Sequence, residues 1–116
     1  MTLAAILLAV AAVGGVIMAA MRFGGRELPP MGLALVHGLF AAAGLITLIV
    51  AVISIRTSLA ATIAVVGFVV AALGGFVLFS YHLRRKALPV NYVVIHGAAA
   101  VISFVILLAA IFAFVG

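Results

Sequence analysis

The chain has 116 residues, of which 71% are apolar and only 6% carry a charge, and its formal net charge is +5. A soluble domain of this length needs a charged surface, so the composition excludes one. A membrane span takes roughly 20 apolar residues, and the chain is long enough for four. The positive charges then belong at lipid headgroups, and nothing indicates nucleic acid binding. The absence of cysteine excludes disulfides and thiolate ligands.

Four apolar runs predict an all-α protein, an integral membrane four-helix bundle of up-down-up-down topology that forms one transmembrane domain over residues 1–116. The expected helices cover about residues 2–22, 31–55, 58–82 and 90–115. Thr57 or Ser58 is the expected N-cap of the third helix. Pro30 and Pro89 stand at the starts of the second and fourth helices, where a missing N–H costs little.

The charged residues predict the orientation of the bundle. The side of the membrane with the two longer connections carries five positive residues, and the other side has only Arg56; the five are Arg22, Arg26, Arg84, Arg85 and Lys86. The positive-inside rule therefore predicts cytoplasmic connections and both termini outside, in a bacterial inner membrane. The first apolar run lacks the basic start of a signal peptide, so we expect a retained helix.

The two halves of the chain resemble each other after a shift of about 60 residues. Residues 11–15 (AAVGG) match residues 71–75 (AALGG), and in both halves a histidine, His37 or His96, stands seven residues after a proline. We expect two repeated helical hairpins, about 2–55 and 58–115. Since each unit holds two helices, the second and fourth helices run in the same direction.

The matched histidines are the main candidates for function, because an imidazole inside a membrane span is costly unless it is paired or coordinated. Both lie about 10 Å inside their helix starts, at equal depth near the cytoplasmic face. In a bundle with neighbouring axes ~10 Å apart, their helices are diagonal neighbours about 14 Å apart. Two imidazoles with a metallated macrocycle between them span that distance, and histidine is a common ligand of haem iron. We therefore predict one haem b, with His37 and His96 as the metal ligands.

Small and basic residues near the histidines predict the rest of the cofactor site. A flat ring in the bundle core needs walls without bulky side chains. The residues expected to provide them are Gly15 and Gly75 of the glycine pairs, with Ala41, Gly44, Ala100 and Ser103 on the histidines' own helical faces. The residues expected to pair with the haem propionates are Arg22, Arg84 and Arg85.

These patterns also have a purely structural interpretation. Small residues at four-residue spacing are typical of helix packing in lipid, and a duplicated histidine is compatible with packing as well as ligation. If the glycines border a cofactor, Gly67, which lies further from the histidine depth, should tolerate a large side chain better than Gly15 or Gly75.

Three other polar residues lie near the same end of the bundle. His82 has no histidine counterpart in the first half, and we expect it at the membrane surface, anchoring the third helix together with Tyr81. A quinone site, a proton site or a propionate partner is the alternative. Asn91 and Tyr92 are candidates for hydrogen bonds to a quinone or a propionate, or are interface residues.

With His37-Gly38 and His96-Gly97 on its second and fourth helices, and glycine pairs facing them, the sequence resembles the membrane b-type cytochromes built on four-helix bundles. The resemblance implies electron transport by haem. Such families often carry two histidine pairs, whereas this chain has no histidine in its outer half, so the resemblance implies a single haem. One haem cannot carry an electron across the bilayer alone, which implies exchange with a quinone or a partner subunit.

Other membrane functions fit less of the sequence. A proton-coupled exporter needs a carboxylate within the membrane, and no predicted span contains Asp or Glu. A scaffold would leave the matched histidines unexplained. The open alternative is a non-catalytic accessory subunit of a larger respiratory or photosynthetic complex, which binds chlorophyll or lipid. The sequence identifies no catalytic residue, and it leaves open a homo-oligomer.

Overall fold

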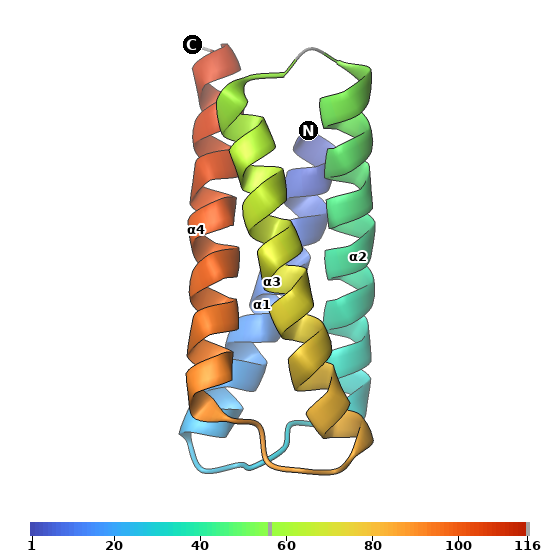
Figure 1. Cartoon of the computed structure of the whole chain (residues 1–116), viewed down its shortest axis with the longest axis vertical. Coiled ribbons are helices and arrows are strands. Elements are labelled where there is room, and N and C mark those ends of the chain that lie inside the picture. Colours follow the sequence, from blue (N-terminus) through green and yellow to red (C-terminus); the bar gives the residue numbers. More distant parts are fainter. Residues whose placement is uncertain (56, 116) are drawn as a thin grey trace.

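The computed structural model describes residues 1–55 and 57–115. Within them the chain forms four helices, α1 (Thr2–Phe23), α2 (Met31–Ser54), α3 (Leu59–Leu83) and α4 (Val90–Val115) (Figure 1). Each begins and ends within one residue of its expected bounds. The hydroxyl of Ser58 accepts a hydrogen bond from the Ala61 N–H, which confirms it as the N-cap of α3.

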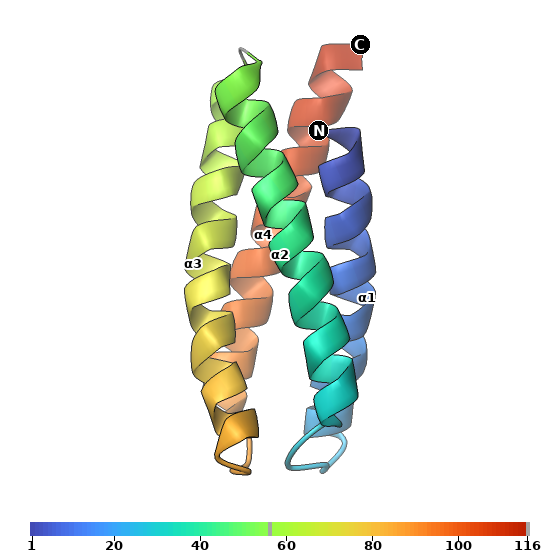
Figure 2. The same cartoon turned by 90° about the vertical axis from the view of Figure 1, so that its right-hand side faces the viewer.

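The helices form a bundle 43 Å long made of two hairpins. α1 packs mainly against α2, and α3 against α4, while the pairs α1–α4 and α2–α3 form the thinner interface between the hairpins. α2 and α4 are therefore diagonal neighbours, and so are α1 and α3 (Figures 1 and 2). All four helices are long and apolar enough to cross a membrane. The predicted membrane four-helix bundle is confirmed.

Both termini lie at one end of the bundle, and the α1–α2 and α3–α4 connections lie at the other (Figures 1 and 2). The five positive residues of the predicted cytoplasmic side are all at the connection end. Arg56, the positive residue expected at the opposite end, falls outside the described residues.

α1 and α3 end in the same kind of turn. The Arg26 N–H donates to the Met21 carbonyl at 3.0 Å, and the Lys86 N–H donates to the Tyr81 carbonyl at 2.9 Å. Such a turn needs a positive φ just after the helix, which Gly25 supplies at 102° and Arg85, at the matching position, supplies at 52°. The two connections are joined by a hydrogen bond from the Leu88 N–H to the Glu27 carbonyl, 3.0 Å long.

Two clusters of buried apolar side chains stabilise the bundle. The larger one lies toward the termini and includes Leu8, Leu48, Phe68 and Leu107. The smaller one lies toward the connections; its buried members are Leu78, Leu88 and Val93. The levels of Gly15 and Gly75, and with them the histidines, fall between the two clusters along the helix axes.

Candidate functional site

His37 is held in place by the backbone of the neighbouring helix. Its Nδ1 lies 2.7 Å from the carbonyl oxygen of Ala11 on α1. A carbonyl only accepts hydrogen bonds, so Nδ1 carries the proton and donates it. In a neutral imidazole the other nitrogen, Nε2, is then unprotonated and has a lone pair available for a metal.

His96 makes the same contact in the second hairpin. Its Nδ1 donates to the carbonyl of Ala71 on α3, also at 2.7 Å. The two imidazoles thus have the same tautomer and the same kind of anchor, from hairpins that match in sequence. A backbone carbonyl on the histidine's second nitrogen is the usual outer partner of a metal-binding imidazole.

The glycine pairs make room for the histidine rings themselves. A Cβ built on Gly15 would lie 3.0 Å from Cε1 of His37, and one built on Gly75 would lie 3.2 Å from Cε1 of His96. Each of these glycines stands four residues after the alanine whose carbonyl accepts the hydrogen bond, so it borders the path of the ring to that carbonyl. A Cβ built on Gly14 or Gly74 would lie at an ordinary 3.5 Å from the Cβ of the histidine in the same hairpin. The sequence predicted that these glycines face a macrocycle. In this structure they face the imidazoles of His37 and His96.

The two rings meet across the centre of the bundle. Their centres are 6.1 Å apart and their planes make an angle of 83°. With metal–nitrogen bonds of about 2 Å and about 1 Å from each nitrogen to its ring centre, two imidazoles on opposite sides of one metal ion have centres about 6 Å apart. The distance between the two ring centres is therefore compatible with a shared metal ion.

In the described part of the chain, His37 and His96 are the candidate protein ligands of this site. Among residues 1–55 and 57–115, no three metal-ligating side chains gather, so a closed site of the structural zinc type does not form there. A pair of imidazoles suits a metal ion whose other ligands come from a macrocycle, as in haem.

The small residues next to the histidines pack within their own hairpins. Gly44 is buried, and a Cβ on it would lie 2.7 Å from Cγ of Leu8 on α1. Ser103 is 2% exposed and donates to the carbonyl of Ala99. Ala41 and Ala100 are half-buried.

Gly67 was expected to be the least restricted of these glycines, but its backbone is in close contact with Ser103. A Cβ on Gly67 would overlap the Ser103 hydroxyl oxygen, so Gly67 is tightly limited in volume. The sequence-based argument considered only depth relative to the histidines, whereas α3 and α4 approach each other closely at this level too.

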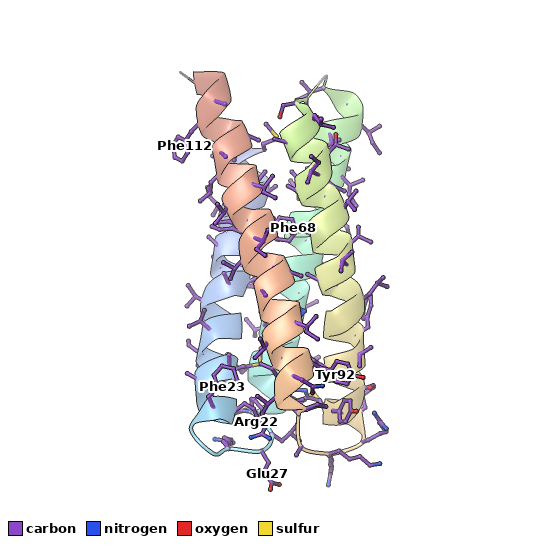
Figure 3. The ribbon with its side chains drawn as sticks, turned by 60° about the vertical axis from the view of Figure 1, so that its left-hand side comes forward. Arg22, Phe23, Glu27, Phe68, Tyr92 and Phe112 are labelled. Atoms are coloured by element: carbon purple, nitrogen blue, oxygen red, sulfur yellow. The ribbon has the colours of Figure 1, made fainter. Side chains whose placement is uncertain are left out.

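The basic residues divide into two groups. Arg22 is half-buried at the end of α1, and its Nε donates to the carbonyl of Leu88 in the other hairpin at 2.8 Å. Figure 3 shows it at the connection end. Arg84 is exposed, bonds to Ser80 on its own helix, and lies 4.6 Å from the ring centre of Tyr81. Arg85 is also exposed.

His82 lies in the last turn of α3, as the sequence predicted, but its side chain points into the bundle. Its side chain is 5% exposed, and its ring stacks on that of Phe79 with centres 6.3 Å apart. The reason is its helical face, since His82 follows the buried residues Ala71 and Leu78 at core spacing. Asn91 and Tyr92, in contrast, are exposed on α4, and the placement of Tyr92 at the connection end is shown in Figure 3.

Sequence reasoning named the histidines but missed their acceptors, the carbonyls of Ala11 and Ala71. A usable signal existed, because a glycine four residues after each alanine leaves that carbonyl open to a side chain of the next helix. Comparisons with models of known protein families, with curated proteins and with solved structures found no match. The assignment of function therefore rests on the site itself.

Proposed function

We propose that this chain is an integral membrane b-type haem protein for electron transfer, with one haem held between His37 and His96. The observation that carries the proposal is the histidine pair, whose ring centres lie 6.1 Å apart with both Nδ1 atoms hydrogen-bonded to backbone carbonyls. Fixed tautomers leave both Nε2 atoms available to a metal.

A bound haem would supply one-electron oxidation and reduction of its iron. The residues of this chain determine how that chemistry is used. His37 and His96 would together hold the haem iron, which favours electron transfer over chemistry on a bound substrate. Clusters of buried apolar side chains lie on both sides of the histidine level along the bundle axis. A quinone or a partner subunit in the membrane is the proposed electron-exchange partner.

The alternative, an accessory subunit that binds chlorophyll, fits the pair less well. A chlorophyll would be held by one imidazole, whereas this site brings two imidazoles together with ring centres 6.1 Å apart. The spacing favours one metal ion between two ligands.

The test is the haem content of the purified protein, produced with an adequate haem supply. We expect one haem per chain, with Soret and α bands, and loss of that haem in both His37→Ala and His96→Ala. Gly38→Ala and Gly97→Ala are matched controls, because they neighbour the histidines and a Cβ on Gly38 or Gly97 meets no atom within 4 Å.

Electron paramagnetic resonance of the oxidised protein checks the geometry. Imidazole planes close to perpendicular, at 83° here, predict a strongly anisotropic low-spin signal. Unchanged haem in either histidine variant, or no Soret band in the wild type, would contradict the proposal. A far-red band would favour the chlorophyll-binding alternative.

A further inference from the structure

His82 is a buried polar side chain without a partner. Neither of its ring nitrogens has a hydrogen-bond partner within the described part of the chain, although the residue is 95% buried, with 5% of its surface exposed. Leaving a buried donor and acceptor unsatisfied costs free energy, and native proteins rarely do so without a functional reason. The ring is thus positioned for a group that these residues do not provide.

An acidic side chain of the protein is not that group. The whole sequence contains a single carboxylate side chain, Glu27, and it is exposed in the α1–α2 connection (Figure 3). A carboxylate that bonds to His82 therefore has to come from a bound molecule.

The position of His82 relates it to the histidine pair. It lies seven residues, or about 10 Å, past Gly75 along α3, toward the connections. Arg22 stands at the matching position of α1, seven residues past Gly15. Each is the last residue of a stripe of inward-facing positions, Ala4, Leu8 and Ala11 on α1 and Ala64, Phe68 and Ala71 on α3. His82 and Arg22 thus lie at the same level, at the connection end of the bundle core, on diagonally opposite helices.

Arg22 retains hydrogen-bonding capacity at this level. A guanidinium carries five N–H groups, and the bond from Nε to the Leu88 carbonyl uses one of them. That bond also fixes the side chain across the interface between the hairpins, which reduces the entropy lost when it binds an anion.

We propose that His82 and Arg22 bind the two carboxylates of the haem, one from α3 and one from α1. This inference rests on the proposed function. Haem carries both carboxylates on one edge, and the two basic residues are related to each other by the same repeat that relates His37 to His96. The carboxylate edge of the ring then points toward the connection end, and its two acidic groups satisfy the partnerless imidazole and the guanidinium.

The test compares binding of haem with binding of its dimethyl ester, in which both carboxylates are blocked. Apoprotein in detergent is titrated with each compound, and the Soret absorbance is followed. We expect His82→Phe, which keeps an aromatic ring against Phe79, to weaken haem binding about 10- to 100-fold, the usual effect of losing a hydrogen bond to a charged group. Affinity for the ester should change less than about threefold, since the ester lacks the charge that this bond recognises.

Arg22→Gln should show the same selective loss. Arg26→Gln is the matched control, since it removes an equal charge from an exposed residue whose Nε bonds to the nearby Leu28 carbonyl, and it should affect neither compound. Thermal unfolding of the His82→Phe apoprotein should be unchanged or shifted to higher temperature, because the variant removes an unsatisfied buried group.

The results separate this inference from the proposed function. A wild-type protein that binds neither compound contradicts the haem assignment itself. If the protein binds haem through both histidines but His82→Phe weakens haem and ester equally, or weakens neither, His82 does not bind a carboxylate. A His82→Phe protein that keeps its haem affinity but is no longer reduced by a soluble quinol has lost a quinone site, which also overturns the inference.

Discussion

Individual glycines set how closely an imidazole approaches the backbone of the next helix. At Gly15 the ring of His37 lies so near that an added Cβ would meet it at 3.0 Å, whereas at Gly14 the nearest atom would be at 3.5 Å. A contact of 3.0 Å forces the ring to move, and 3.5 Å does not. The hydrogen bond to the Ala11 carbonyl depends on that difference.

Alanine substitutions at the adjacent glycines Gly14 and Gly15 test whether one added methyl group displaces the His37 ring. Gly15→Ala should displace the His37 ring by a few tenths of an ångström and weaken haem binding about tenfold, because a small misplacement lengthens both the metal bond and the bond to Ala11. Gly14→Ala should leave the affinity unchanged. Haem titration of the two variants provides the measurement.

The same test can be repeated in the second hairpin. There Gly75→Ala should affect haem affinity as Gly15→Ala does, and Gly74→Ala as Gly14→Ala does. Equal affinities in all four variants would assign the glycine pairs to ordinary helix packing.

The helix ends show where the two matching elements differ. The turn after α1 has Gly25 at a positive φ, where glycine is free of steric cost, but the turn after α3 has Arg85 at φ 52°. For a residue with a side chain this conformation costs roughly 1–2 kcal/mol. A glycine avoids that cost, but part of the gain in stability is offset because glycine loses more backbone entropy on folding.

Arg85→Gly should therefore raise the free energy of unfolding by about 1 kcal/mol. Gly25→Ala should lower the free energy of unfolding by a similar amount, although a Cβ there meets no atom within 4 Å, because the cost lies in the backbone. Unfolding of both variants in detergent, followed by circular dichroism, gives the comparison. A stability loss in Arg85→Gly would show that the side chain, and not the turn, determines stability at this position.

The sequence predicts where each helix begins and ends, but not which face of each helix turns toward the bundle core. Prolines, charges and the Ser58 cap interrupt the apolar runs, so each end could be placed within a residue. The helices themselves are apolar on all sides, which removes the amphipathic pattern that normally shows which face turns inward. For that reason three features became clear only from the structure: the burial of His82, the contact of Gly67 with Ser103 and the carbonyl acceptors of the histidines. The position of His37 and His96 along their helices, in contrast, followed from counting residues after proline.

For the whole molecule, the placement of charge predicts sidedness. The positive residues flank the helix ends nearest the histidines, and the positive-inside rule predicts that those ends, and the proposed haem, lie near the cytoplasmic leaflet. Both termini share the opposite end (Figure 1). We propose that they lie outside, in a bacterial inner membrane.

Reporter fusions after Gly116 test the orientation. A reporter active only in the periplasm should work at this position, and one active only in the cytoplasm should not. The reverse result would place the termini and the connections on the other sides and move the haem to the outer leaflet. Impermeant oxidants added outside intact cells should react slowly with the reduced haem if the orientation is as proposed.

The hairpin construction has a consequence for assembly. Each hairpin carries one complete half of the site, with a histidine, its carbonyl acceptor and its glycine pair, and neither half can ligate a metal from both sides alone. As separate chains, two such halves would have to meet in the membrane at a rate that depends on their abundance. The short segment between Ser54 and Leu59 converts that encounter into an intramolecular one, with a local concentration of the millimolar order typical of short linkers. Duplication followed by fusion would in this way make a two-chain cofactor site independent of expression level.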